Sequence, residues 1–199
     1  MKEISMTSVA NRLSTSEIYG LLIALTGISL AFAIAERSLE MFFVGLLFFG
    51  PGFVLHELGH KFTAQAHGCH AEFKIFPLLL GLSILVSFTG FAFVLFGAVY
   101  FSHEEDEISV EVVGRVLMSG PLVNIALAGA FLLPLMAGGP ILGWIGLWGL
   151  CANAFIAAFN LIPCPPLDGY GVFMWNKLYW ALGLLSALLL LALAFFVPF

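Results

Sequence analysis

The stretch that decides the fold is residues 41–60, MFFVGLLFFGPGFVLHELGH. Its first fifteen residues carry no charged side chain, and most of them are large and apolar. Such a run favours a helix inside a lipid bilayer, whose hydrocarbon core about 20 helical residues can cross. The run then ends in two histidines and a glutamate, and ionisable groups inside a membrane span are costly and usually functional. The stretch therefore predicts a membrane span that carries a chemically active site.

The composition of the whole chain agrees with a membrane protein. The chain has 199 residues, of which 61% are hydrophobic and only 10% are charged, whereas soluble domains are about 25% charged. Seven basic and twelve acidic residues cannot cover the surface of a soluble domain of this size. The hydrophobic content also excludes a disordered chain. A net charge of −5 without a basic patch argues against a nucleic-acid-binding protein.

The apolar runs predict an all-α polytopic protein of the cell membrane with about six transmembrane helices. The predicted spans are residues 18–35, 41–67, 76–89, 110–136, 141–162 and 178–197. Residues 1–17 form a polar tail, and residues 18–199 form one membrane-embedded domain. An even number of spans would place both ends of the chain on one side of the membrane. Residues 90–101 either extend the third span or form a short β-hairpin at the membrane rim, and their periodicity does not decide between the two.

The segment His56-Glu57-Leu58-Gly59-His60 has the pattern H-E-x-x-H. Residues four apart lie on one face of a helix, so His56 and His60 can share one metal ion. The pattern is typical of two zinc ligands followed by a glutamate that acts as a general base. The alternative is a pair of core histidines, which would leave Glu57 buried in the membrane without a partner. We therefore predict one Zn²⁺ per chain.

A catalytic zinc site needs a third protein ligand and an open position. The candidates elsewhere in the chain are His67, His70, Glu72, His103, the acidic residues of 104–107 and Asp168. Asp168 is favoured because it is the only charged residue between Arg115 and Lys177. The prolines of residues 163–166 break the helix before it, and irregular backbone at membrane depth must be buried in protein or line a wet cavity. The alternative is that Asp168 caps the last helix at the membrane surface.

Asn160 lies eight residues before Asp168 and is a candidate for contact with a substrate. A buried amide can donate a hydrogen bond to a carbonyl oxygen or to an oxyanion. The alternative is hydrogen bonding between helices, which we favour for the two other amides in predicted spans, Asn124 and Asn153.

These residues together resemble the site-2 protease family of intramembrane zinc metalloproteases. The resemblance rests on residues 56–60 and on Asn160-x-x-Pro163-x-Pro165-x-x-Asp168-Gly169, and residues 120–124 resemble a further recurrent segment of that family. It implies that His56, His60 and Asp168 hold zinc, that Glu57 is the base and that Asn160 steadies the substrate or oxyanion. It also implies regulated cleavage of a membrane-protein substrate within or near its transmembrane segment. Many members carry a PDZ or CBS domain, for which this chain has no room, so we expect a minimal form.

Two other classes of function are compatible with a metal site in a membrane. A zinc transporter would need a polar route on both sides of the metal, and residues 41–55 offer none. A catalytically silent relative could bind metal or act as a scaffold for transmembrane helices, but it would not need Glu57. The oligomeric state and the identity of the substrate do not follow from the sequence.

Overall fold

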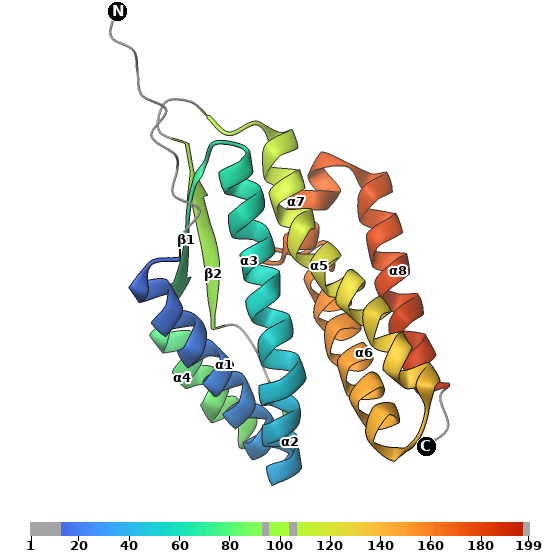
Figure 1. Cartoon of the computed structure of the whole chain (residues 1–199). Helices are drawn as coiled ribbons and strands as arrows, with labels where there is room; N and C mark the ends of the chain where they lie inside the picture. The colour runs from blue at the N-terminus through green and yellow to red at the C-terminus, as the bar shows by residue number, and fades with distance from the viewer. Residues whose placement is uncertain (1–12, 93–95, 104–106, 197–199) are drawn as a thin grey trace, which may run out of the picture.

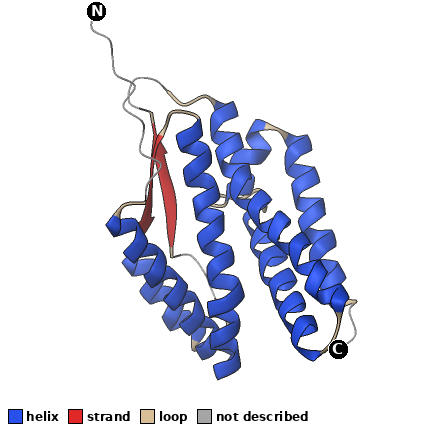
Figure 2. Ribbon diagram, in the orientation of Figure 1, coloured by secondary structure: helices blue, strands red, loops and turns tan. Residues whose placement is uncertain are grey.

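The computed structural model describes residues 13–92, 96–103 and 107–196, which form a helical bundle beside one small sheet (Figure 1). Five of its helices are long and apolar enough to cross a membrane. They are α1 (Thr15–Glu36), a continuous helix over Leu39–Ala66, α5 (Val110–Ala137), α6 (Pro140–Asn160) and α8 (Lys177–Phe195). Figure 2 shows how far helices predominate over the two strands. The predicted all-α polytopic fold is confirmed.

The helix over Leu39–Ala66 carries the H-E-x-x-H segment and has an irregular turn in its middle. It consists of α2 (Leu39–Val44), a π-helical turn η1 (Gly45–Phe49) and α3 (Gly50–Ala66). The π turn precedes Pro51, which has no N–H to donate and crowds the preceding turn. The segment Gly50-Pro51-Gly52 thus follows a wider turn, and the helix continues through it into α3. A Cβ on Gly45 would lie 2.7 Å from Cα of Ser29, so this glycine lets α1 pack closely against η1.

The prediction of a third span at residues 76–89 is wrong. Its helix, α4 (Pro77–Ser87), has 11 residues and is about 16 Å long, roughly half of what a bilayer core requires. Along the chain it follows strand β1 (His70–Ile75) and precedes strand β2 (Gly97–Ser102). The two strands pair antiparallel with His70 opposite Ser102. The segment therefore begins and ends at the same end of α3 instead of crossing the bundle, and α4 packs beside α1 (Figure 1).

The sheet corrects two further predictions. β2 (Gly97–Ser102) confirms the strand alternative for residues 90–101, but its partner is β1, in a stretch where the sequence predicted no strand. Residues 93–95 lie outside the described ranges. β1 alternates between exposed and buried side chains, a period-2 signal that the short charged sequence HAEFKI obscured. The described residues hold five candidate spans instead of the predicted six, and five crossings would place the start of α1 and the end of α8 on opposite sides of a membrane.

Helix α1 begins earlier than predicted. Ser14 caps it and accepts a hydrogen bond from the backbone N–H of Glu17, whose carboxylate returns one to the backbone of Ser14. Ser14 and Glu17 therefore belong to the folded body, although they fall within the tail predicted over residues 1–17, of which residues 1–12 are not described.

Helix α3 lies at the centre of the molecule, between the sheet on one side and α5 on the other (Figure 1). The predicted break follows α6, and α7 (Asp168–Trp175) begins at the far end of the loop. The loop is folded back against the bundle: Trp180 Nε1 donates to the carbonyl oxygen of Leu161 at 2.7 Å, and a Cβ on Gly169 would overlap the backbone of Leu161. This packing turns the first residue of α7, Asp168, toward α3.

Candidate metal centre and active site

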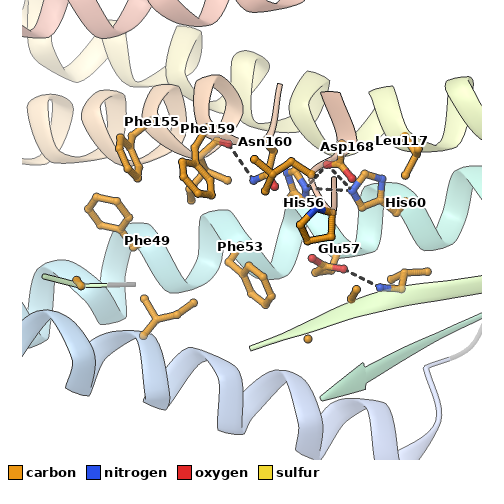
Figure 3. A pocket seen from close by; sticks show the side chains of 18 of the residues that line it. Phe49, Phe53, His56, Glu57, His60, Leu117, Phe155, Phe159, Asn160 and Asp168 are labelled. Carbon is orange, nitrogen blue, oxygen red and sulfur yellow. Dashed lines mark hydrogen bonds and ion pairs between the residues drawn. The ribbon is translucent and has the colours of Figure 1, made fainter. Parts of the chain in front are cut away.

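Three side chains converge on one point between α3 and α7 (Figure 3). His56 and His60 come from successive turns of α3, and their Nε2 atoms lie 3.0 Å apart. Asp168 Oδ2 is 3.0 Å from Nε2 of His56 and 3.2 Å from Nε2 of His60. The two histidines are buried and the aspartate is nearly so. The predicted ligand set is therefore assembled in space.

The hydrogen bonds on the other side of each ring fix which nitrogen carries the proton. His60 Nδ1 lies 2.7 Å from the carbonyl oxygen of Val116, which only accepts, so Nδ1 donates. His56 Nδ1 lies 2.6 Å from Oδ1 of Asn124 and donates to it. With Nδ1 protonated, each ring in its neutral form directs the lone pair of Nε2 toward Asp168.

In this form each of the three converging atoms offers a lone pair, and such a set of ligand atoms fits a zinc ion. Two imidazole lone pairs and a carboxylate oxygen are common ligands of catalytic zinc, which keeps a fourth position open. Gly120 of α5 leaves the space next to them empty: a Cβ there would lie 2.5 Å from Nε2 of His60 and 2.7 Å from Nε2 of His56. His56, His60 and Asp168 could therefore hold one metal ion.

Glu57 lies beside this group, and the sheet determines the direction of its carboxylate. Its Oε2 accepts a hydrogen bond of 3.0 Å from the backbone N–H of Val99 in β2. Val99 pairs with Phe73 of β1 on the other side of the strand, so the edge of β2 faces α3. A backbone donor leaves no trace in the sequence, so sequence reasoning missed the role of Val99.

A cavity of about 310 Å³ connects these groups, and one end of it is aromatic. That end is lined by four phenylalanines: Phe49 of η1, Phe53 of α3, and Phe155 and Phe159 of α6 (Figure 3). All five predicted site residues line the cavity: His56, Glu57, His60, Asn160 and Asp168.

Asn160 points into the cavity from the last turn of α6. Its Nδ2 donates one hydrogen bond to the carbonyl oxygen of Ile156 at 3.0 Å, and an amide nitrogen carries a second hydrogen. The residue is thus bonded within its own helix and also has a donor to offer in the cavity.

The competing metal ligands do not join the site. His67, His70 and His103 are exposed, and Glu72 lies 3.7 Å from Lys74 on the surface. Within the described ranges, His56, His60 and Asp168 are the group whose ligand atoms lie within 4.8 Å of one another. Residues 104–106 of the acidic loop are outside those ranges. Asp168 does not cap the last helix either: Asn176 caps α8, and Asp168 is the first residue of α7, whose cap residue is Leu167.

Two residues of α5 contribute to the site in ways that the sequence did not reveal. Gly120 and Asn124 are four residues apart, so both face α3. The predicted hydrogen bonding of Asn124 between helices is present, since its Nδ2 donates to Oδ1 of Asn153 at 3.0 Å. Asn124 also contacts His56, which was not predicted.

The fold and the site define the class: a polytopic membrane protein with a buried candidate metal centre next to a glutamate. The chain is 37% identical over 175 residues to a protein of Methanocaldococcus jannaschii named "Putative zinc metalloprotease", a match that covers 86% of this chain and 90% of the relative. The chain belongs to the zinc metalloprotease family of this archaeal protein. No family model matches the chain, and no solved structure matches it significantly.

Proposed function

We propose that this chain is an intramembrane zinc metalloprotease of the site-2 protease type, which hydrolyses peptide bonds within or near transmembrane segments of other membrane proteins. One observation carries the proposal. Three metal-ligating acceptors and a glutamate share a cavity whose walls include helices long enough to span a membrane. A peptide bond that reaches this cavity would meet a hydrolytic site below the membrane surface.

His56, His60 and Asp168 would hold the zinc ion. When bound, zinc supplies a Lewis acid that polarises a carbonyl and lowers the pKa of water toward about 7. Glu57 is the general base: its carboxylate accepts the proton of the attacking water and later gives it to the leaving amine. The N–H of Val99 holds one carboxylate oxygen at 3.0 Å, which orients the group without occupying the other oxygen.

Asn160 would act on the carbonyl oxygen of the substrate. Its remaining Nδ2 hydrogen can donate to the negative charge that develops on that oxygen, and preorganised donors of this kind are usually a large part of catalysis. A peptide in an intact helix has its carbonyl already hydrogen-bonded. The substrate must therefore unwind locally before Glu57 and Asn160 can act on it.

The alternative functions are less well supported. A transporter needs a polar path beyond the metal, whereas Phe49 and Phe53 line the cavity along α3 beyond His56. A silent scaffold needs no general base, yet Glu57 is buried, oriented and beside the ligands.

The test is zinc analysis of purified protein in detergent, combined with cleavage of a model transmembrane substrate followed by mass spectrometry. Wild type is compared with Glu57→Gln, and Glu111→Gln on the exposed start of α5 is the matched control. We expect about one zinc per chain in all three proteins and loss of cleavage only in Glu57→Gln. Full cleavage by Glu57→Gln would overturn the proposal, and so would zinc flux across vesicles without cleavage by the wild type.

A further inference from the structure

We propose that Asn124 and Asn153 are positioning residues that hold His56 in its metal-binding orientation through a relay of hydrogen bonds across three helices. The inference rests on the proposed function only in taking His56 as a metal ligand. It assigns to both amides a task beyond joining helices.

The relay begins at Asn153 of α6, which is 2% exposed. Its Nδ2 donates to the carbonyl oxygen of Gly149 at 2.9 Å, so its Oδ1 must point the other way, toward α5. There Oδ1 accepts a hydrogen bond of 3.0 Å from Nδ2 of Asn124. A backbone carbonyl thus determines the orientation of the first amide.

Asn124 of α5 passes this orientation on to α3. Its Nδ2 also donates to the carbonyl oxygen of Gly52 at 3.0 Å, so both amide hydrogens are used. Its Oδ1 then faces Nδ1 of His56 at 2.6 Å. If the Asn124 amide were reversed, its oxygen would face the acceptors on Gly52 and Asn153. His56 must therefore donate from Nδ1, which leaves Nε2 to bind metal.

The helices are shaped to admit these amides. A Cβ on Gly52 would lie 2.9 Å from Oδ1 of Asn153, so the glycine leaves room for that oxygen beside α3. Gly52 and His56 are four residues apart on α3, and Asn124 bonds to both. An amide that served only to join α5 to α6 would need the bond to Asn153 alone.

The two ligand histidines differ in what supports them. The backbone carbonyl of Val116 holds His60, and no substitution of a side chain removes it. A side chain holds His56, so mutagenesis can remove its support while leaving the three ligands in place. Partners of this kind typically change metal affinity by about 10–100-fold when they are mutated.

The experiment measures zinc affinity by competition with a chelator and the absorption spectrum of the Co²⁺-substituted protein. The variants are Asn124→Leu, which removes the relay, Asn124→Asp, which keeps an oxygen for His56, and Asn153→Ala. Asn176→Ala is the control, because Asn176 caps α8 and has no part in the site. We expect zinc affinity to fall about 10–100-fold in Asn124→Leu and less in the other two relay variants. Asn176→Ala should keep wild-type affinity, and the Co²⁺ spectrum should change only in the relay variants.

The outcome is decisive even if one variant fails to fold. If folded Asn124→Leu binds zinc as the wild type does, the inference is wrong and the amides only join helices. If Asn124→Leu does not fold, Asn153→Ala and Gly52→Ala decide, since each disturbs the relay and keeps Asn124. Wild-type affinity in both would overturn the inference. A wild type that binds no zinc would instead contradict the proposed function.

Discussion

Two buried polar clusters lie on opposite sides of α3, and consecutive residues of the helix belong to them. His60 faces α5 and joins His56 and Asp168 in what we call the metal cluster. Lys61 faces α1 and forms an ion pair with Glu17, which we call the ion-pair cluster. Lys61 is 2% exposed and Glu17 is 3% exposed, so burial alone does not distinguish the two.

The clusters differ in the balance of donors and acceptors. In the ion-pair cluster, the carboxylate of Glu17 accepts from Nζ of Lys61, from the N–H of Phe73 at 3.0 Å and from the N–H of Ser14 at 2.8 Å. Its cation is part of the chain, and the cluster is complete. The metal cluster, with both imidazoles in their neutral form, brings three acceptors together. Buried polar groups normally have partners, and a cation bound from outside the chain would supply one to this cluster.

The ion-pair cluster nevertheless supports the candidate active site. Glu17 binds the backbone of Phe73 in β1, and Phe73 is paired with Val99 in β2. Val99 in turn donates to Glu57. The ion-pair cluster therefore helps to hold the sheet that orients the proposed base, while the metal cluster would bind the metal.

The largest effect should come from emptying the metal cluster. Asp168→Ala removes its only anionic ligand, so we expect zinc content to fall from about one per chain to nearly zero, with loss of cleavage. Zinc analysis of purified protein measures this, and Glu72→Ala on the exposed face of β1 is the control. Unchanged zinc content in Asp168→Ala would mean that the third ligand is another residue.

The comparison of the clusters shows what the sequence could and could not predict. The rarity of charge in the apolar runs identified His56, Glu57, His60 and Asp168, because a lone ionisable group in a span is conspicuous. The same rule did not identify Lys61 and Glu17. These two residues are 44 positions apart in the sequence, and they meet only because α1 packs on α3 and β1.

The five candidate spans were predictable from long apolar runs, but the short helix α4 between β1 and β2 was not. Residues 76–89 are as apolar as a true span, and only the pairing of β1 with β2 reveals that the chain turns back. Long-range pairing also decides the hydrogen bond from Val99 to Glu57 and the relay to His56. Periodicity reports which face of one element is buried, and it does not report which element covers that face.

The next largest effect should come from breaking the ion-pair cluster, and it should lower the stability of the fold without changing metal binding. Lys61→Met leaves the Glu17 carboxylate buried without its cation, which should cost about 3–5 kcal/mol of folding free energy. Zinc content per folded molecule should not change. Denaturant unfolding in detergent measures the first quantity and metal analysis of the folded fraction measures the second. The double variant Lys61→Met/Glu17→Gln should recover much of the loss, because it removes both charges. Loss of zinc from folded Lys61→Met would show that the clusters are not separable.

The smallest effect tests the space around the metal cluster without changing any charge. Gly120→Ala would place a Cβ 2.5 Å from Nε2 of His60, where the ligand atoms meet. Gly129→Ala on the same helix is the matched control, since its Cβ would meet nothing within 4 Å and both changes raise helix propensity equally. We expect zinc affinity, measured by chelator competition, to fall about 10-fold or more in Gly120→Ala and to stay at the wild-type value in Gly129→Ala. Equal affinities in the two variants would mean that the metal does not lie beside Gly120. The ion-pair cluster should respond to neither change, because α3 separates it from α5.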